Sequence, residues 1–89
     1  MTPVLSPRER AAVLFIHGYV DTHGHSPSLD EIADHIGVAH RAAAHYVIRR
    51  LRLAGIVATA PVKQARSFKL ADNVVVHRDE IYIAVETDA

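Results

Sequence analysis

The chain has 89 residues, of which 49 % are hydrophobic, and its ten Lys and Arg residues balance its ten Asp and Glu residues. This length accommodates one domain with a small core, because a second hydrophobic core needs many more residues. The sequence has no cysteine, which excludes disulfides, thiol catalysis and cysteine-ligated zinc.

The N-terminal residues show no charged segment followed by an apolar run, so no signal peptide is expected. No stretch approaches the roughly 20 apolar residues that a membrane-spanning helix needs. We therefore expect a soluble protein of the cytoplasm.

The net charge is zero, but the charged residues are distributed unevenly along the chain. Residues 1–71 hold nine basic and five acidic residues, whereas residues 72–89 hold one basic and five acidic residues. Residues 41–71 alone hold seven Lys or Arg and no acid. A surface that faces nucleic-acid phosphates needs such a local excess, because each neutralised phosphate releases a counterion. We expect a DNA-binding domain over residues 1–71 and an acidic β extension over residues 72–89.

Two capping boxes predict the first two helices. Ser6 and Glu9 have the required spacing, with Pro7 at the first helical position, and this helix should end near Gly24. Ser28 and Glu31 repeat the pattern before a shorter helix that Gly37 stops. The apolar residues with helical spacing are Ala12, Val13, Ile16, Tyr19 and Val20 in the first helix and Leu29, Ile32, Ala33 and Ile36 in the second.

A third helix is predicted from about His40 to Leu53, shortly after Gly37. Ala44, Ile48 and Leu51 form its apolar face, with Ala43 and Val47 beside them, and Gly55 is the expected C-cap. Two helices joined by a tight turn that contains glycine indicate a helix-turn-helix.

The hydrophobic period changes after the third helix. Residues 56–60 and 66–70 predict two strands, with Phe68 and Leu70 pointing inward, joined by a loop over residues 61–65. A basic hairpin at this position is typical of a wing. Residues 74–77 and 81–85 predict a further strand pair. The expected fold is therefore α+β: a three-helix winged helix-turn-helix with a two-stranded wing and an appended C-terminal β-hairpin.

Several short motifs occur in order along the first two thirds of the chain. They are Leu5-Ser6-Pro7-Arg8-Glu9-Arg10, Gly24, Pro27-Ser28, Glu31-Ile32-Ala33, Ile36-Gly37, Leu51 and Gly55-Ile56. Each is common among helix-turn-helix proteins, but the ordered set resembles the N-terminal DNA-binding domain of the LexA repressor family. The resemblance implies a domain that inserts its third helix into the major groove of DNA.

Three features depart from that family's pattern. Members usually begin the recognition helix with a Ser cap and a nearby Asn or Ser, where this sequence has Ala39-His40-Arg41-Ala42-Ala43. The acidic pair of many members is replaced by His45-Tyr46. Members also continue into a self-cleaving peptidase domain with a Ser–Lys pair, whereas this sequence ends at Ala89, so the resemblance does not assign damage-induced autocleavage to it. The resemblance thus implies a shared scaffold with different base-reading residues, and it does not imply an SOS-type operator.

The face of the third helix opposite its apolar residues is the candidate DNA-contact surface. Its residues are His40, Arg41, Ala42, His45, Tyr46, Arg49 and Arg52. The helix start reaches base edges in this docking mode, where Arg41 can pair with guanine and Ala42 can touch a thymine methyl group. Lys63 and Arg66 of the wing are the candidate contacts to the adjacent backbone. A merely solvated face is the alternative, but the lack of acid on this helix favours DNA.

We therefore expect sequence-specific binding of double-stranded DNA by a transcriptional repressor that acts through operator occupancy. The alternative is a protein-interaction module, an antirepressor or adaptor, that binds another regulator. The sequence shows no nucleophile motif and no Gly-rich phosphate loop, so an enzyme is not expected. The seven histidines are dispersed apart from His23 and His25, and we expect no metal site or cofactor.

Residues 72–89 permit three interpretations. Their apolar strands offer an edge through which a homodimer could form, as two-fold operators favour. The same strands could instead extend the wing sheet and cover the small core. The acidic segment could also dock another protein.

Overall fold

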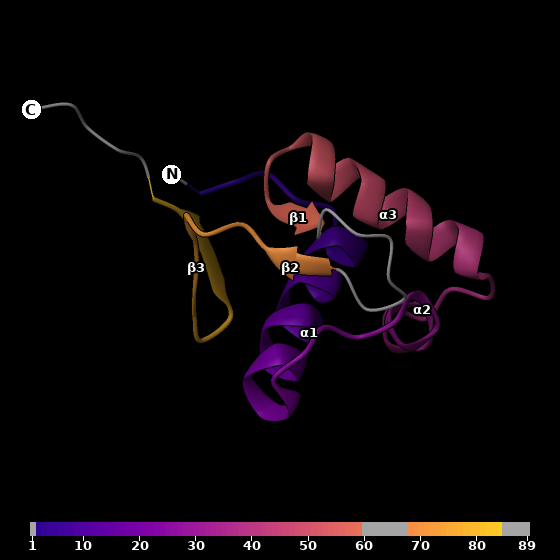
Figure 1. Ribbon diagram of the computed structural model, residues 1–89. Coiled ribbons are helices and arrows are strands. Elements are labelled where there is room, and N and C mark those ends of the chain that lie inside the picture. The colour runs from indigo at the N-terminus through magenta and orange to yellow at the C-terminus, as the bar shows by residue number, and fades with distance from the viewer. Residues whose placement is uncertain (1, 60–67, 85–89) are drawn as a thin grey trace, which may run out of the picture.

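The computed structural model describes residues 2–59 and 68–84. Three helices come first: α1 (Pro7–His23), α2 (Leu29–Ile36) and α3 (Arg41–Leu53). Four strands follow: β1 (Val57–Thr59), β2 (Phe68–Leu70), β3 (Val74–His77) and β4 (Glu80–Ile83). This arrangement confirms the predicted α+β fold, with the helices preceding two small strand pairs (Figure 1).

Both predicted capping boxes are present. The Ser6 hydroxyl accepts the Glu9 N–H at 3.2 Å, and the Glu9 carboxylate accepts the Ser6 N–H at 3.1 Å. Ser28 and Glu31 exchange the equivalent bonds at 3.0 and 3.2 Å. These bonds satisfy backbone donors that the first turn of a helix otherwise leaves unpaired. The predicted starts of α1 and α2 are therefore confirmed.

The two ends of α3 are built differently. At its start His40 has the extended backbone of an N-cap residue, but within the described part of the chain its imidazole makes no capping hydrogen bond. At its end the Ile56 N–H donates to the Leu51 carbonyl at 2.9 Å and the Gly55 N–H donates to the Arg52 carbonyl at 3.0 Å. This is a Schellman motif, and Gly55 adopts its left-handed position with φ of 77°. The helix ends at Leu53, as predicted, and its cap is Ala54, one residue before the expected C-cap Gly55.

The apolar faces predicted for the three helices meet in one core. The buried hydrophobic residues are Ala12, Val13, Ile16, Ile32, Ala33, Ala44, Val47, Ile48, Leu51, Ile56, Val57 and Ile81. Ile81 lies on β4 and is only 2 % exposed, so the C-terminal hairpin contributes to the same core as the helices. The side chain of Phe68, predicted to point inward, lies outside the described set.

The described strands form two separate antiparallel pairs, β1 with β2 and β3 with β4. Val57 lies opposite Leu70 in the first pair, and Val76 lies opposite Ile81 in the second. The second pair therefore covers the core without extending the first. β4 begins at Glu80, one residue before the predicted strand, because Glu80 pairs with His77 across a tight turn.

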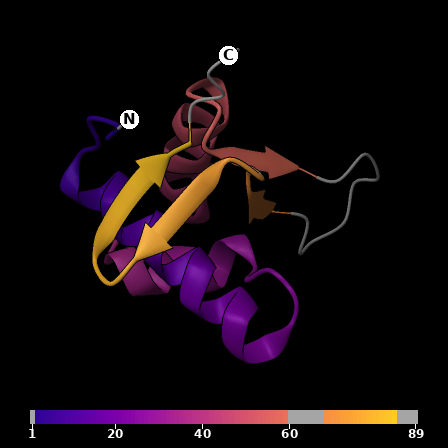
Figure 2. The same cartoon turned by 90° about the vertical axis from the view of Figure 1, so that its left-hand side faces the viewer.

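The C-terminal hairpin lies on the side of α1 that faces away from α2 (Figures 1 and 2). α3 lies along the outside of the molecule, with one side against α1 and α2 and the other open (Figure 1). Across the described residues, the helices are too short or too polar to cross a membrane.

Candidate nucleic-acid interface

The seven residues of α3 and its N-cap that are predicted to contact DNA are all exposed: His40, Arg41, Ala42, His45, Tyr46, Arg49 and Arg52. Packing explains their exposure, because Ala44, Val47, Ile48 and Leu51 occupy the opposite face and are buried. The structure therefore brings these seven residues together on one outward surface. The two predicted wing contacts, Lys63 and Arg66, lie outside the described residues.

Arg41 is held near the start of α3 by an acidic residue of α2. Its Nε atom lies 3.8 Å from the Oδ1 atom of Asp30, and the two side chains are 64 % and 73 % exposed. An ion pair this exposed contributes little stability, because water and salt screen it. Arg41 therefore stays accessible to a partner, and Asp30 is the nearest negative charge recorded for it.

Arg50 has a different role from the other arginines of α3. Its Nε atom lies 3.7 Å from the Glu9 carboxylate, whose residue is only 9 % exposed. A hydrogen bond with the Tyr46 hydroxyl and the nearby Glu9 charge raise the pKa of Arg50. Arg50 thus ties α3 to α1, and it was not among the predicted DNA contacts.

The pKa of the Glu9 carboxyl group is subject to opposing influences. Burial alone raises its pKa, but hydrogen bonds from Ser6 and the charge of Arg50 outweigh burial and lower it below the usual value. The carboxylate is therefore negative at neutral pH. It neutralises part of the positive charge of Arg50 at the side of α3.

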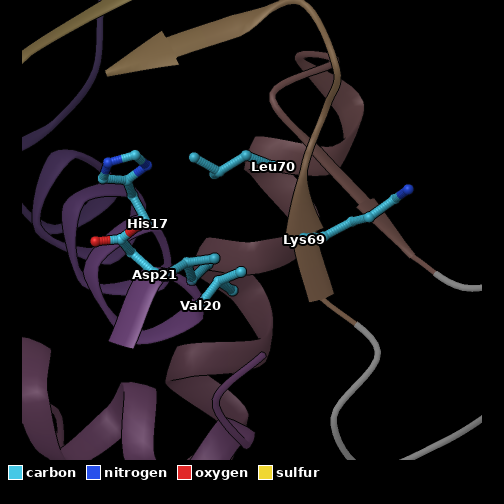
Figure 3. Close-up of a pocket in the computed structure, with 6 residues that line it drawn as sticks. His17, Val20, Asp21, Lys69 and Leu70 are labelled. Carbon is cyan, nitrogen blue, oxygen red and sulfur yellow. The ribbon is translucent and has the colours of Figure 1, made fainter. Parts of the chain in front are cut away.

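The wing contributes one described basic side chain on its outer surface. Lys69 lies opposite Ala58 and is exposed, and its side chain extends away from α1 (Figure 3). Leu70 points toward α1, and both Leu70 and Lys69 line a cavity of about 310 Å³ with Val20 and His17 (Figure 3). The alternation along β2 thus places the charge outside and the apolar residue against the helix.

The model of the LexA DNA binding domain family matches residues 1–67. The chain belongs to this family. This match confirms the predicted resemblance and, with it, that the matched region is a DNA-binding domain.

Two relatives of this LexA-type domain are both named LexA repressor 2. The protein from Pseudomonas putida is 40 % identical over 68 residues, which is 76 % of this chain. The protein from Pseudomonas syringae pv. tomato is 38 % identical over 69 residues, which is 78 % of this chain. The chain spans about a third of the length of these relatives, 33 % and 34 % respectively.

Two exposed histidines of this LexA-type domain stack on aromatic rings of α1. The His23 ring stacks on Tyr19 with 4.0 Å between centroids, and the His35 ring stacks on Phe15 at 4.2 Å. Tyr19 in turn donates to the Glu31 carboxylate at 2.8 Å. In the described part of the chain no three His, Cys, Asp or Glu residues gather closely enough to hold a metal ion. Of the two, His35 joins α2 to α1, whereas His23 stacks within α1.

Besides Arg50, sequence reasoning missed Arg8 beside the candidate interface. Arg8 lines a groove next to α3 together with Tyr46 and Arg50. The spacing of Ser6 and Glu9 indicates only a helix cap. Nothing in the sequence relates the first turn of α1 to the outer side of α3. Only the tertiary arrangement places Arg8 there.

Proposed function

We propose that this protein is a transcriptional repressor that binds a specific double-stranded DNA sequence and acts by occupying its operator. The observation that carries the proposal is the exposed face of α3, which presents Arg41, Arg49 and Arg52 and lacks acid, in a LexA-type DNA-binding domain. The relatives' name, LexA repressor 2, supports repression. The protein acts by binding and not by catalysis, in the cytoplasm.

In this proposal the start of α3 reads base edges in the major groove. His40, Arg41 and Ala42 reach the bases first, with Arg41 paired to guanine and Ala42 against a thymine methyl group. His45 and Tyr46 follow one turn later. These residues differ from those that the family resemblance implies at the start of the helix, so the proposal does not assume an SOS-type operator.

Other basic residues hold the backbone on either side of the bases. Arg49 and Arg52 lie later on α3, where phosphates are the nearer partners. Lys63 and Arg66 of the wing contact the adjacent backbone in this proposal. The outward direction of Lys69 supports a wing surface that faces DNA.

We extend the proposal to a homodimer formed through residues 72–89. Val75 and Tyr82 lie opposite each other on β3 and β4, and they are 48 % and 36 % exposed. This apolar pair supports a contact between two copies, which would match a two-fold operator. Sedimentation of the wild type and of Val75→Glu tests it, since the variant should shift a dimer to a monomer. A monomeric wild type at DNA-binding concentrations would contradict the dimer and leave the hairpin free for a different protein.

Selection from a random duplex pool tests sequence-specific binding. The purified protein should enrich one motif, with half-sites in two-fold symmetry if the homodimer forms. Arg41→Ala should relax the preference at one base pair, because a bidentate contact discriminates by about 1–3 kcal/mol. A pool that remains random after repeated rounds, despite measurable binding, would contradict specific operator recognition.

A further inference from the structure

An open groove of about 650 Å³ runs between the first turn of α1 and the side of α3. It is lined by Ser6, Pro7, Arg8, Glu9, Ala43, Tyr46, Val47 and Arg50. A second groove of about 440 Å³ continues along α3 and is lined by Tyr46, Arg49, Arg50 and Leu53. Because Tyr46 and Arg50 line both, the two grooves are neighbours on the flank of α3, and we call them together the α1–α3 groove.

The α1–α3 groove is positively charged. Among its described lining residues, Arg8, Arg49 and Arg50 are basic and Glu9 alone is acidic. Glu9 is buried and already engaged by Ser6 and Arg50, so it offers little negative charge to a ligand. The charge of Arg8 has no counterpart recorded among the described ion pairs. An anionic partner therefore fits this groove.

The groove is also continuous with the proposed DNA-contact face. Tyr46 and Arg49 belong to both surfaces, and the groove leads from them to Arg8 on α1. When the start of α3 contacts the bases of a duplex, the DNA backbone runs alongside the flanks of the helix. Arginine suits phosphate there, because its planar guanidinium donates two parallel hydrogen bonds.

We propose that the α1–α3 groove binds a DNA backbone phosphate, held by Arg8 of α1 together with the Tyr46 hydroxyl. This inference rests on the proposed function and adds a contact from outside the helix-turn-helix and the wing. Arg50 positions the site, since its contacts with Glu9 and Tyr46 fix the wall of the groove. The contact is to phosphate, so it contributes affinity without sequence preference.

The test compares Arg8→Ala with Arg10→Ala in the full chain. Arg10 is an exposed arginine on the same helix, and it lines neither part of the groove. The two side chains point in different directions, because positions two apart lie on different sides of a helix. Binding to a fluorescent random-sequence duplex and to the selected operator is measured across a range of NaCl concentrations. Circular dichroism confirms that both variants are folded.

We expect Arg8→Ala to weaken binding by about threefold to tenfold on both duplexes and to reduce the slope of log affinity against log salt by about one. Arg8→Lys should retain most of the slope, because the charge remains, and Arg10→Ala should match the wild type. If Arg8→Ala binds like Arg10→Ala while the wild type binds DNA with a steep salt dependence, the groove proposal is overturned and the proposed function stands. If the wild type binds neither duplex, both are overturned.

Discussion

The carboxylate of Glu9 lies 3.7 Å from the guanidinium of Arg50, and this contact joins the first turn of α1 to the side of α3. The same carboxylate closes the capping box by accepting the Ser6 N–H at 3.1 Å. Glu9 thus caps the start of α1 and also contacts the helix that carries the candidate DNA-contact face. The contact links local helix capping to the geometry of the interface.

The lowered pKa of Glu9 makes folding stability depend on pH. A carboxyl group whose pKa falls on folding stabilises the native state above its unfolded pKa, about 4.3 for Glu, and that stabilisation is lost as pH drops through the folded value. We expect the free energy of unfolding, measured by urea titration, to fall as the pH drops below about 4.3. Glu9→Gln should be less stable at pH 7 and show a flatter profile at low pH. An unchanged profile in the variant would contradict this role.

The uncapped start of α3 predicts a conflict between stability and binding. His40 has an extended N-cap backbone but no capping bond in the described structure, so His40→Ser should stabilise the protein by about 0.5–1 kcal/mol. The same change should weaken DNA binding, because His40 belongs to the proposed contact face. Thermal unfolding and duplex titration measure the two effects. Ala39→Ser, which changes the residue before the cap, is the control and should change neither stability nor affinity much.

The pair formed by Asp30 and Arg41 predicts that removing an acid strengthens binding. Asp30→Asn frees Arg41 and removes a negative charge near the proposed path of the phosphates. The affinity for duplex should rise by about twofold to fivefold, in keeping with the energy of about 0.2–1 kcal/mol for exposed pairs. Asp34→Asn is the matched control, because Asp34 is another exposed acid on α2 with no recorded pair to α3. Equal effects of the two changes would show that Asp30 has no special position.

The burial of Ile81 predicts that the C-terminal hairpin is part of the folded core. Ile81 is 2 % exposed, so Ile81→Ala should lower the free energy of unfolding by about 2–4 kcal/mol. Val75→Ala on the outer side of the same hairpin should change it by less than about 0.5 kcal/mol. Urea denaturation measures both. Similar small effects would mean that the hairpin folds apart from the helices.

Local signals explain why much of the fold follows from the sequence. Ser6 with Glu9, and Ser28 with Glu31, satisfy backbone donors within one turn, so their spacing alone locates the helix starts. Gly55 ends α3 because the Schellman motif needs a left-handed residue. The exposed face of α3 follows from the period of its apolar residues.

Contacts between distant segments could not be predicted in the same way. Glu9 and Arg50 meet only because α1 and α3 cross at a particular place, and no spacing in the sequence encodes that crossing. In the sequence, Ile81 is one apolar residue of a β-branched segment. Its burial depends on where the hairpin packs against the core. Arg8 lines the α1–α3 groove for the same reason, since the opposite wall of that groove is formed by α3.

The central claim, that the exposed face of α3 binds DNA, is tested most directly by a salt titration of duplex binding. The wild type is compared with the double variant Arg41→Ala/Arg49→Ala, which should melt at nearly the same temperature because both side chains are exposed. We predict that wild-type affinity falls steeply between about 50 and 200 mM salt. The double variant should bind at least about tenfold more weakly, since it loses one base contact and one phosphate contact. A double variant that binds like the wild type, or a wild type that does not bind even at low salt, would contradict the account.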